Sequence, residues 1–173
     1  MNNLIVNSIT RSREEWMGIL KLPRELETSV IAANVLIVPS MIPTQPKAFV
    51  EGTLHLYAYL QSQLGEGVEI CITEEEYEEL ELNSRAVRLG RFIVKSFVLP
   101  LFLGIIGNYI YDKIREPDTV RDDDKPEYQK PVDVTFTIAV EDSTGKKKEF
   151  QYEGPASDYK VIAEEIERLW NEE

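Results

Sequence analysis

The most regular pattern of hydrophobic and polar positions lies near the C-terminus. Apolar side chains alternate with mostly polar ones from residue 132 to residue 141, which is the period of a half-buried β-strand. Turn residues follow at 142–145, and Phe150 and Tyr152 continue the pattern on a second strand. A helix capped by Ser157 or Asp158 then carries one apolar stripe, formed by Tyr159, Ile162, Ile166, Leu169 and Trp170. Residues 132–173 therefore predict a ββα unit.

The N-terminal half carries a strand–helix–strand pattern. Ser29–Val38 is rich in apolar and β-branched residues, which favours a strand covered on both faces. Apolar residues recur at helical spacing over 47–64, and Gly65 stands where a C-terminal cap belongs. Val68–Ile72 predicts another short buried strand. We therefore expect a βαβ unit within an N-terminal α/β unit that spans residues 1–91.

Two further segments of this unit have weaker patterns. Leu4–Ile9 is a short apolar run, and Thr10–Leu20 predicts a short helix. Thr73 and Glu76 have the spacing of a capping box, so a helix is expected to begin near Glu74. Three arginines at three-residue spacing, Arg85, Arg88 and Arg91, would carry this helix into the apolar run that follows.

That run, from Phe92 to Tyr111, is the longest apolar stretch in the chain. As a helix its residues would span about 30 Å, close to the thickness of a bilayer's hydrocarbon core. Lys95 near one end and Tyr111 at the other suit a membrane interface. Between them Pro100 would bend the helix, and Gly104 and Gly107 would leave a flat strip on its surface. The residues that define this predicted transmembrane segment are Phe92, Lys95, Pro100, Gly104, Gly107 and Tyr111. Residues 92–111 are therefore predicted to form a single membrane-spanning helix.

The same run is also compatible with the central helix of a soluble α/β fold. Lys95 and Ser96 are polar, Pro100 prefers helix ends, and Gly104 and Gly107 lower helix propensity. In that alternative the segment is buried by protein on every side, and the chain is a soluble oligomer. Residues 112–131 are charged, rich in proline and without periodicity, which predicts a solvated linker before the ββα unit.

Composition narrows the classes of partner and compartment. The net charge is −12, from 19 Lys and Arg against 31 Asp and Glu, which argues against nucleic acid as a partner. The single cysteine cannot form an intramolecular disulfide. No basic leader precedes an apolar stretch at residues 1–16, so no cleaved secretory signal is expected. We expect a membrane protein whose N-terminal unit lies in the cytoplasm, with a cytoplasmic protein as the alternative.

The sequence contains no pattern that points to catalysis, a cofactor or a metal. His55 is the only histidine, and Cys71 lies in a predicted buried strand, where a thiol behaves as a small apolar group. The acidic runs at 74–81 and 122–124 are interpreted as solvated surface. Lys146–Lys148 would keep the hairpin soluble, with anionic lipid as an alternative partner.

One set of polar residues is placed where α/β proteins bind ligands. In open sheets ligands bind beyond the carboxyl ends of parallel strands, and the two strands of the predicted βαβ unit end near residues 39 and 72. The candidate ligand loop consists of Ser40, Thr44, Gln45 and Glu74. The alternative is an ordinary loop followed by a helix cap.

From the residues we expect a single-pass, membrane-anchored binding or regulatory protein, such as a sensor, adaptor or effector component, without catalytic activity. Its expected partners are membrane lipid and either another protein or a second copy of the chain. The alternative function is a soluble oligomeric α/β protein with a small-ligand or enzymatic site beside Ser40.

Overall fold

A computed structural model describes residues 3–40, 44–81, 86–115 and 132–172. These residues form a mixed α/β fold built on a six-stranded sheet. The strands are β1 (Leu4–Asn7), β2 (Val35–Val38), β3 (Phe49–Val50), β4 (Val68–Ile70), β5 (Glu79–Leu80), β6 (Val87–Lys95), β7 (Asp133–Glu141) and β8 (Lys147–Pro155). The α-helices are α1 (Arg13–Leu20), α2 (Arg24–Ala32), α3 (Thr53–Leu64), α4 (Leu99–Arg115) and α6 (Tyr159–Asn171).

The main sheet has the strand order β1-β8-β7-β6-β2-β4. Strands β2 and β4 are parallel, and so are β6 and β7, whereas the other neighbours are antiparallel. Strands β3 and β5 form a separate two-stranded parallel sheet. The main sheet therefore contains strands from both residues 1–91 and residues 132–173, so the N-terminal unit and the ββα unit share one sheet.

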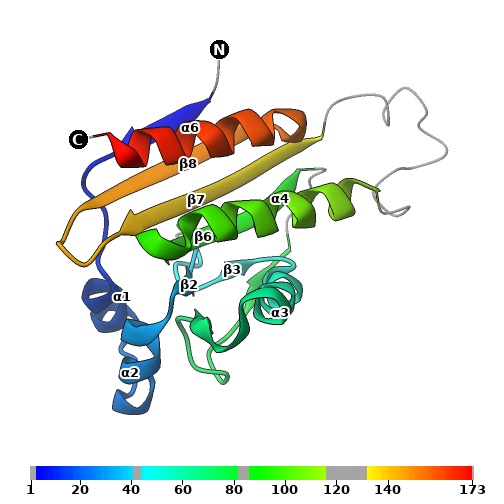
Figure 1. Cartoon of the computed structure of the whole chain (residues 1–173). Helices are drawn as coiled ribbons and strands as arrows, with labels where there is room; N and C mark the ends of the chain where they lie inside the picture. The colour runs from blue at the N-terminus through cyan, green and yellow to red at the C-terminus, as the bar shows by residue number, and fades with distance from the viewer. Residues whose placement is uncertain (1–2, 41–43, 82–85, 116–131, 173) are drawn as a thin grey trace.

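Helices α3, α4 and α6 lie side by side over one face of the main sheet (Figure 1). The even-numbered residues of β7 point toward this layer and are buried, as are Phe92 and Val94 of β6. Phe92 packs edge-on against Phe102 of α4, with ring centroids 5.2 Å apart. The hydrophobic core thus lies between β6, β7 and the central helix α4.

The opposite face is apolar at one end and polar at the other. Arg13, at the start of α1, bonds to Glu141, whose side chain lies on the face opposite to Val140, so α1 reaches this second face. All four residues of β2 are buried, which requires cover on both faces. Along β7, the odd-numbered positions change from Ala139 to Thr137 and Thr135, and this polar end of the face holds the site described below.

Several predicted elements are confirmed. The strand at 132–141, the hairpin and the final helix occur as β7, β8 and α6, and the buried side of α6 is formed by Tyr159, Ile162, Ile166 and Trp170. The predicted βαβ unit occurs as β2, α3 and β4, with β2 and β4 parallel. The short helix predicted over Thr10–Leu20 occurs as α1, which Ser12 and Glu15 close with a capping box.

The prediction of one helix over residues 92–111 is wrong at its start. Phe92–Lys95 complete β6, Ser96–Val98 form a single 3₁₀ turn, and the helix begins at Leu99. Strand β6 has hydrogen-bonded neighbours on both sides, β2 and β7, which a local pattern of apolar residues cannot reveal. Pro100 lies in the first turn of α4, where its missing N–H has no helical partner to lose.

Three other boundaries differ from the predictions. Ser29–Ala32 belongs to α2 rather than to a strand, and within it only Val30 is buried, a one-sided pattern typical of a surface helix. Phe49 and Val50 form β3 rather than the start of α3. No helix begins near Glu74: the Glu76 amide does donate to Thr73 Oγ1, at 3.3 Å, but the chain then extends to pair β5 with β3.

Among the described residues, one helical stretch, Ser96–Arg115, is long and apolar enough to cross a membrane, with a mean hydropathy of 1.3. Of the 18-residue apolar segment within this stretch, 44% is buried inside the protein. This is compatible with a membrane helix and equally with the core helix of a soluble protein. Of the predicted linker 112–131, residues 112–115 end α4, which corrects the linker's start. The remainder, with the acidic run at 122–124, lies outside the described residues.

Candidate functional site

The polar end of the second sheet face is organised in rows that run across neighbouring strands. Arg88 of β6 pairs with Thr135 of β7, which pairs with Glu153 of β8. The next row contains Arg91, Thr137 and Gln151. Cα partners in a sheet carry side chains on the same face, so each row presents its polar groups to the same side.

A β-bulge brings the two arginines onto this face. Arg88 and Arg91 are three residues apart and would lie on opposite faces of a regular strand. The register shifts between Arg88 and Gly90, so that Leu89 is an extra residue, and both arginines come to lie opposite odd-numbered residues of β7. Gly90 has a φ of 99°, a conformation that side-chain-bearing residues rarely adopt. The glycine thus permits a bulge that places both arginines on the same face of the sheet.

These rows form the floor of a groove of about 700 Å³. Ser40, which follows β2, and Val50 of β3 line the groove beside Gly90 of β6, whereas Glu153 lines it from β8 and Asp133 from β7, the strand between. A Cβ on Gly90 would lie 3.9 Å from Ser40 Oγ, so the serine hydroxyl sits above the bulge. The groove is large enough for a small organic ligand.

Arg91 is held in place by a buried carboxylate. Its Nη1 donates to Glu149 Oε2 at 3.1 Å, and Glu149 is only 8% exposed. The same carboxylate accepts hydrogen bonds from Thr10 Oγ1 at 3.0 Å and from Asn7 Nδ2 at 3.4 Å. The charge of Arg91 is therefore already compensated, and its position is fixed by the protein.

Arg88 and Ser40 are different, because each has a buried polar atom without a hydrogen-bond partner among the described residues. These atoms are Arg88 Nε and Ser40 Oγ. Buried donors are normally satisfied, and leaving one unsatisfied costs about 1–3 kcal/mol. Both residues line the groove, so two unsatisfied donors lie beside a space that a ligand could occupy.

The four residues of the predicted ligand loop do not all lie together. Ser40 lines the groove, whereas Glu74 lines a second cavity on the other side of the N-terminal unit. Thr44 and Gln45 are exposed and line neither of these two cavities. Sequence reasoning missed Arg88 and Arg91 as site residues because it assigned them to a helix. The available signal was the Arg-Leu-Gly-Arg sequence, in which a glycine permits a bulge.

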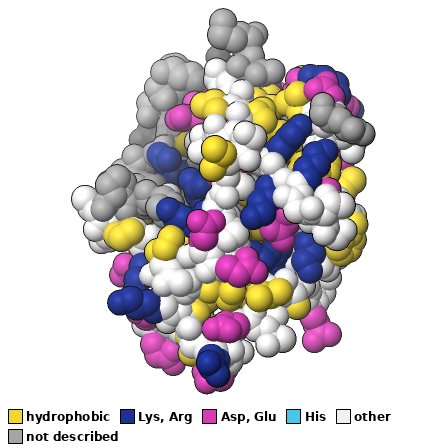
Figure 2. All heavy atoms as spheres, turned by 90° about the vertical axis from the view of Figure 1, so that its left-hand side faces the viewer, with side chains coloured by type: hydrophobic (Ala, Val, Ile, Leu, Met, Phe, Trp, Pro, Cys, Tyr) yellow, Lys and Arg dark blue, Asp and Glu magenta, His cyan; other side chains and the backbone are white. Residues whose placement is uncertain are grey.

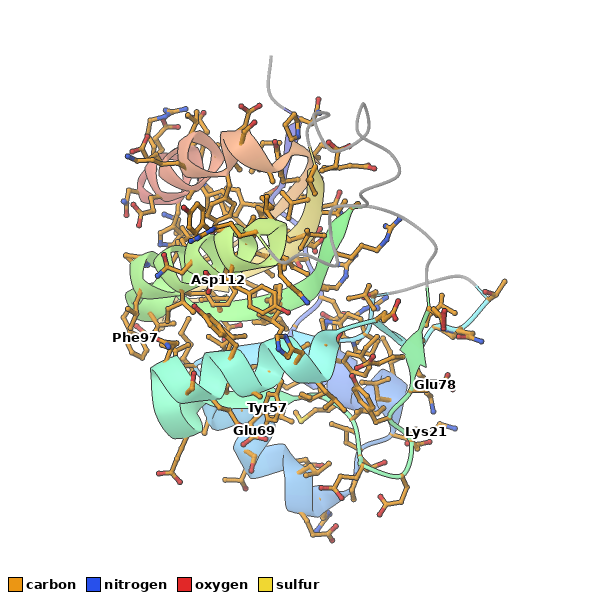
Figure 3. The ribbon with its side chains drawn as sticks, turned by 90° about the vertical axis from the view of Figure 1, so that its right-hand side faces the viewer. Lys21, Tyr57, Glu69, Glu78, Phe97 and Asp112 are labelled. Atoms are coloured by element: carbon orange, nitrogen blue, oxygen red, sulfur yellow. The ribbon has the colours of Figure 1, made fainter. Side chains whose placement is uncertain are left out.

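The second cavity, also of about 700 Å³, lies among α2, α3 and β4. It is lined by acidic, tyrosine and apolar side chains, among them Tyr57 and Glu69, which Figure 3 shows near one another below α3. Burial raises the pKa of Glu69, and burial together with the Glu69 charge raises the pKa of Tyr57. Unlike the groove, this cavity has no described lining residue with a buried polar atom that lacks a hydrogen-bond partner.

The other residues considered for chemistry have structural contacts. His55 Nδ1 lies 3.1 Å from the Tyr109 hydroxyl, which ties α3 to α4. Cys71 is fully buried. Within the described ranges, no group of three or more His, Cys, Asp or Glu side chains is placed to hold a metal ion.

The hairpin lysines contact the end of the last helix. Figure 2 shows Lys and Arg side chains among acidic ones on the side of the molecule that faces left in Figure 1. Lys148 Nζ donates to the Leu169 carbonyl at 2.6 Å, and Lys146 Nζ donates to the Trp170 carbonyl and lies 4.3 Å from the Trp170 ring. These two lysines therefore satisfy free carbonyls at the C-terminal end of α6.

The residues of the predicted membrane segment divide between core contacts and surface. Lys95 Nζ donates to the Ala32 carbonyl at 3.2 Å. A Cβ on Gly107 would come within 3.2 Å of the Tyr159 ring, so this glycine allows α6 to approach α4. Pro100, Gly104 and Tyr111 are exposed on the outer side of α4.

Comparisons with known proteins add no family to this picture. No family model, curated protein or solved structure matches the chain. The candidate site therefore rests on the geometry of the groove alone.

Proposed function

We propose that this protein binds a small polar ligand in the groove beside Ser40 and acts through that binding, as a sensor or regulatory component, rather than through catalysis. The observation that carries the proposal is the pair of unpartnered buried donors, Arg88 Nε and Ser40 Oγ, in one groove. The volume of the groove, about 700 Å³, supports a ligand of small-molecule size.

The surroundings of Ser40 favour binding over nucleophilic catalysis. A catalytic serine needs a neighbouring base that accepts its proton, and Ser40 Oγ has no hydrogen-bond partner among the described residues. The described residues that line the groove include no His, Cys or Lys. The two arginines are donors with permanently positive charge, which suits recognition better than proton transfer.

The proposal is tested by titrating the ¹⁵N-labelled full-length protein with a panel of carboxylates, phosphates, sugars and amines. At least one compound is expected to shift the backbone amide signals of Ser40, Gly90 and Thr135. Thr135→Leu, which fills the groove floor, should abolish these shifts. Thr28→Leu, on the exposed surface of α2, should leave them unchanged. A panel that leaves every groove amide unshifted would contradict the proposal.

Membrane anchoring is the second candidate, and the outer surface of α4 favours it. Phe97, in the 3₁₀ turn that leads into α4, is 74% exposed, and Leu101, four residues later in α4, is 56% exposed. Figure 3 shows the Phe97 side chain pointing outward. Exposed neighbouring apolar side chains on an apolar helix are suited to lipid contact. In this proposal the protein remains in the membrane pellet after a carbonate wash and leaves it only with mild detergent. A protein that is soluble and monodisperse without detergent would instead support α4 as a core helix.

Association with another protein or with a second copy is also proposed. Among the described residues the main sheet has β1 and β4 as its edge strands, and edge strands are the usual place where another chain adds a strand. Light scattering coupled to size-exclusion chromatography tests self-association. A mass equal to that of one chain at all concentrations would count against it.

A further inference from the structure

We infer that the ligand of the groove is a small zwitterion, with a carboxylate or phosphate bound by Arg88 and Ser40 and a positively charged group at the end near Glu153. This inference rests on the proposed function and specifies the chemistry of the ligand. Its basis is the unequal distribution of charge along the groove.

The first step is the charge balance of the arginines. Arg13 and Arg91 each donate to a carboxylate, Glu141 and Glu149 respectively. Arg88 has no such partner among the described residues, although its Nε is buried. A guanidinium group stays charged at any physiological pH, and a partly buried charge without a counterion is costly. An anionic ligand group would supply the missing counterion.

The second step is the geometry around Arg88. The Ser40 hydroxyl sits above Gly90, two residues along the bulged strand from Arg88, and it also lacks a partner. A guanidinium group and a hydroxyl on residues that line one groove provide donors for the oxygens of a carboxylate or a phosphate. Because Glu149 already engages Arg91, that arginine adds positive potential to the floor without being the main anchor.

The third step concerns the opposite end. Thr135 separates Arg88 from Glu153 in one cross-strand row, so the backbones of these two residues are two strand spacings apart, or about 10 Å. Glu153 is exposed at this end of the groove, and the exposed Asp133 lies on the strand between, β7, two residues before Thr135. The Glu153 carboxylate, with Asp133 on the neighbouring strand, repels a second anionic group and attracts an ammonium group. The groove therefore discriminates against ligands that are negative at both ends.

The test uses three probes with equal carbon chains: γ-aminobutyrate, butyrate and succinate. Each is titrated into the full-length protein while the amide signals of Ser40, Gly90 and Thr135 are followed. We expect γ-aminobutyrate to bind about tenfold more tightly than butyrate, and succinate to bind no better than butyrate. Inorganic phosphate is titrated in parallel, so that recognition of phosphate and of carboxylate can be compared.

Two pairs of variants test which residues bind the negative and the positive end of the ligand. Arg88→Gln should weaken binding of both γ-aminobutyrate and butyrate about tenfold or more, whereas Arg24→Gln, on exposed α2, should change neither affinity. Glu153→Gln should reduce the affinity for γ-aminobutyrate to that for butyrate. Glu27→Gln, also exposed on α2, is its matched control. Thermal unfolding of each variant without probe establishes that it is folded.

The possible results separate this inference from the proposed function. If butyrate and γ-aminobutyrate bind with equal affinity and Glu153→Gln changes neither affinity, the inference that the ligand carries a positively charged group is wrong. If neutral compounds of the panel shift the groove amides while every anionic and zwitterionic probe fails, the inference is overturned and the proposed function stands. If no compound of any class shifts these amides, both fail.

Discussion

Arg13 Nε donates a hydrogen bond to Glu141 Oε2 at 2.8 Å and thereby joins the first helix to the end of β7, 128 residues away in sequence. Arg13 is only 4% exposed, and its Nη1 also donates to the Val30 carbonyl in α2. One side chain therefore connects α1, α2 and the central sheet. The packing of α1 and α2 against the sheet therefore depends on residues from both the N-terminal and the C-terminal parts of the chain.

Replacing Arg13 with methionine should destabilise the fold, because Glu141 would keep its charge in a partly buried position without a partner. We expect the free energy of unfolding to fall by about 2–3 kcal/mol, below the range for a fully buried pair because Glu141 is 21% exposed. Chemical denaturation measures the change, and Arg24→Met on the surface of α2 serves as the control. Equal denaturation midpoints for the two variants would contradict the structural role of Arg13.

Cys71 should be unreactive in the folded protein. Its side chain is fully buried, and burial raises the pKa of the thiol to about 12, although Arg13 lowers it slightly. Since only the thiolate reacts with a disulfide reagent, labelling at mildly alkaline pH should require unfolding. Labelling rates are measured across a denaturant series and should rise with the unfolded fraction. Rapid, complete labelling without denaturant would show that the thiol is accessible.

Glu79 should make the stability of the helix α3 depend on pH. Burial alone would raise the pKa of its carboxyl, but hydrogen bonds from the Tyr77 hydroxyl and from the Gly52 and Leu54 amides outweigh burial and lower the pKa below 4.5. The carboxylate thus caps the start of α3 from a distant strand, with Gly52 N at 3.1 Å and Leu54 N at 3.2 Å.

A folded-state pKa below the unfolded value adds stability at pH values above the unfolded pKa, and this stability is lost as pH falls through the folded pKa. Glu79→Gln should therefore cost about 0.5 kcal/mol at neutral pH, a small value because the site is exposed to solvent, and nothing at strongly acidic pH. Denaturation midpoints from neutral to acidic pH measure this dependence. Glu78→Gln, its exposed neighbour, is the control, and parallel curves for the two variants would count against the cap.

Lys148 should stabilise the C-terminal end of α6. Its ammonium group donates to the Leu169 carbonyl, one of the carbonyls that an α-helix leaves without an internal partner. Lys148→Met should lower the free energy of unfolding by about 0.5–1 kcal/mol. The comparison is with Lys147→Met on the same hairpin, which should have a smaller effect. Hydrogen exchange at the last turn of α6 provides a local readout, and unchanged exchange in Lys148→Met would refute the contact.

The C-terminal unit could be predicted from sequence because its signals are local. The alternation from Val132 to Glu141, the turn at 142–145 and the stripe on α6 each lie within one short segment, and each matches the structure. The βαβ unit was predictable for the same reason, since strand and helix periods alternate between residues 35 and 70.

The interpretation of residues 92–111 shows where local patterns become insufficient. A buried helix and a buried strand can both consist of apolar residues, so an apolar run alone does not distinguish them. Phe92–Lys95 forms a strand because β2 and β7 lie on either side of it and pair with it. Glu79 is a comparable case. In sequence it is one acid in an acidic run, and it becomes a helix cap only because β5 lies beside β3 at the start of α3.

The candidate site was only partly predictable. Ser40 was found because it follows a strand of the βαβ unit, and the strand ends of such units are common ligand sites. Arg88 and Arg91 lie on β6, far in sequence from Glu153 on β8, and their presence on one sheet face depends on a bulge and on the register of β6 with β7 and of β7 with β8.

By itself, the sequence determined the elements whose patterns repeat over a few residues: the βαβ unit, the hairpin, the last helix and the presence of one apolar stretch that must avoid water. The tertiary structure decided how these elements share one sheet, where the apolar stretch changes from strand to helix, and which polar groups face the same groove. The physical reason is that periodicity records which side of an element is buried, whereas strand neighbours, register and unpaired buried donors depend on contacts between residues distant in sequence.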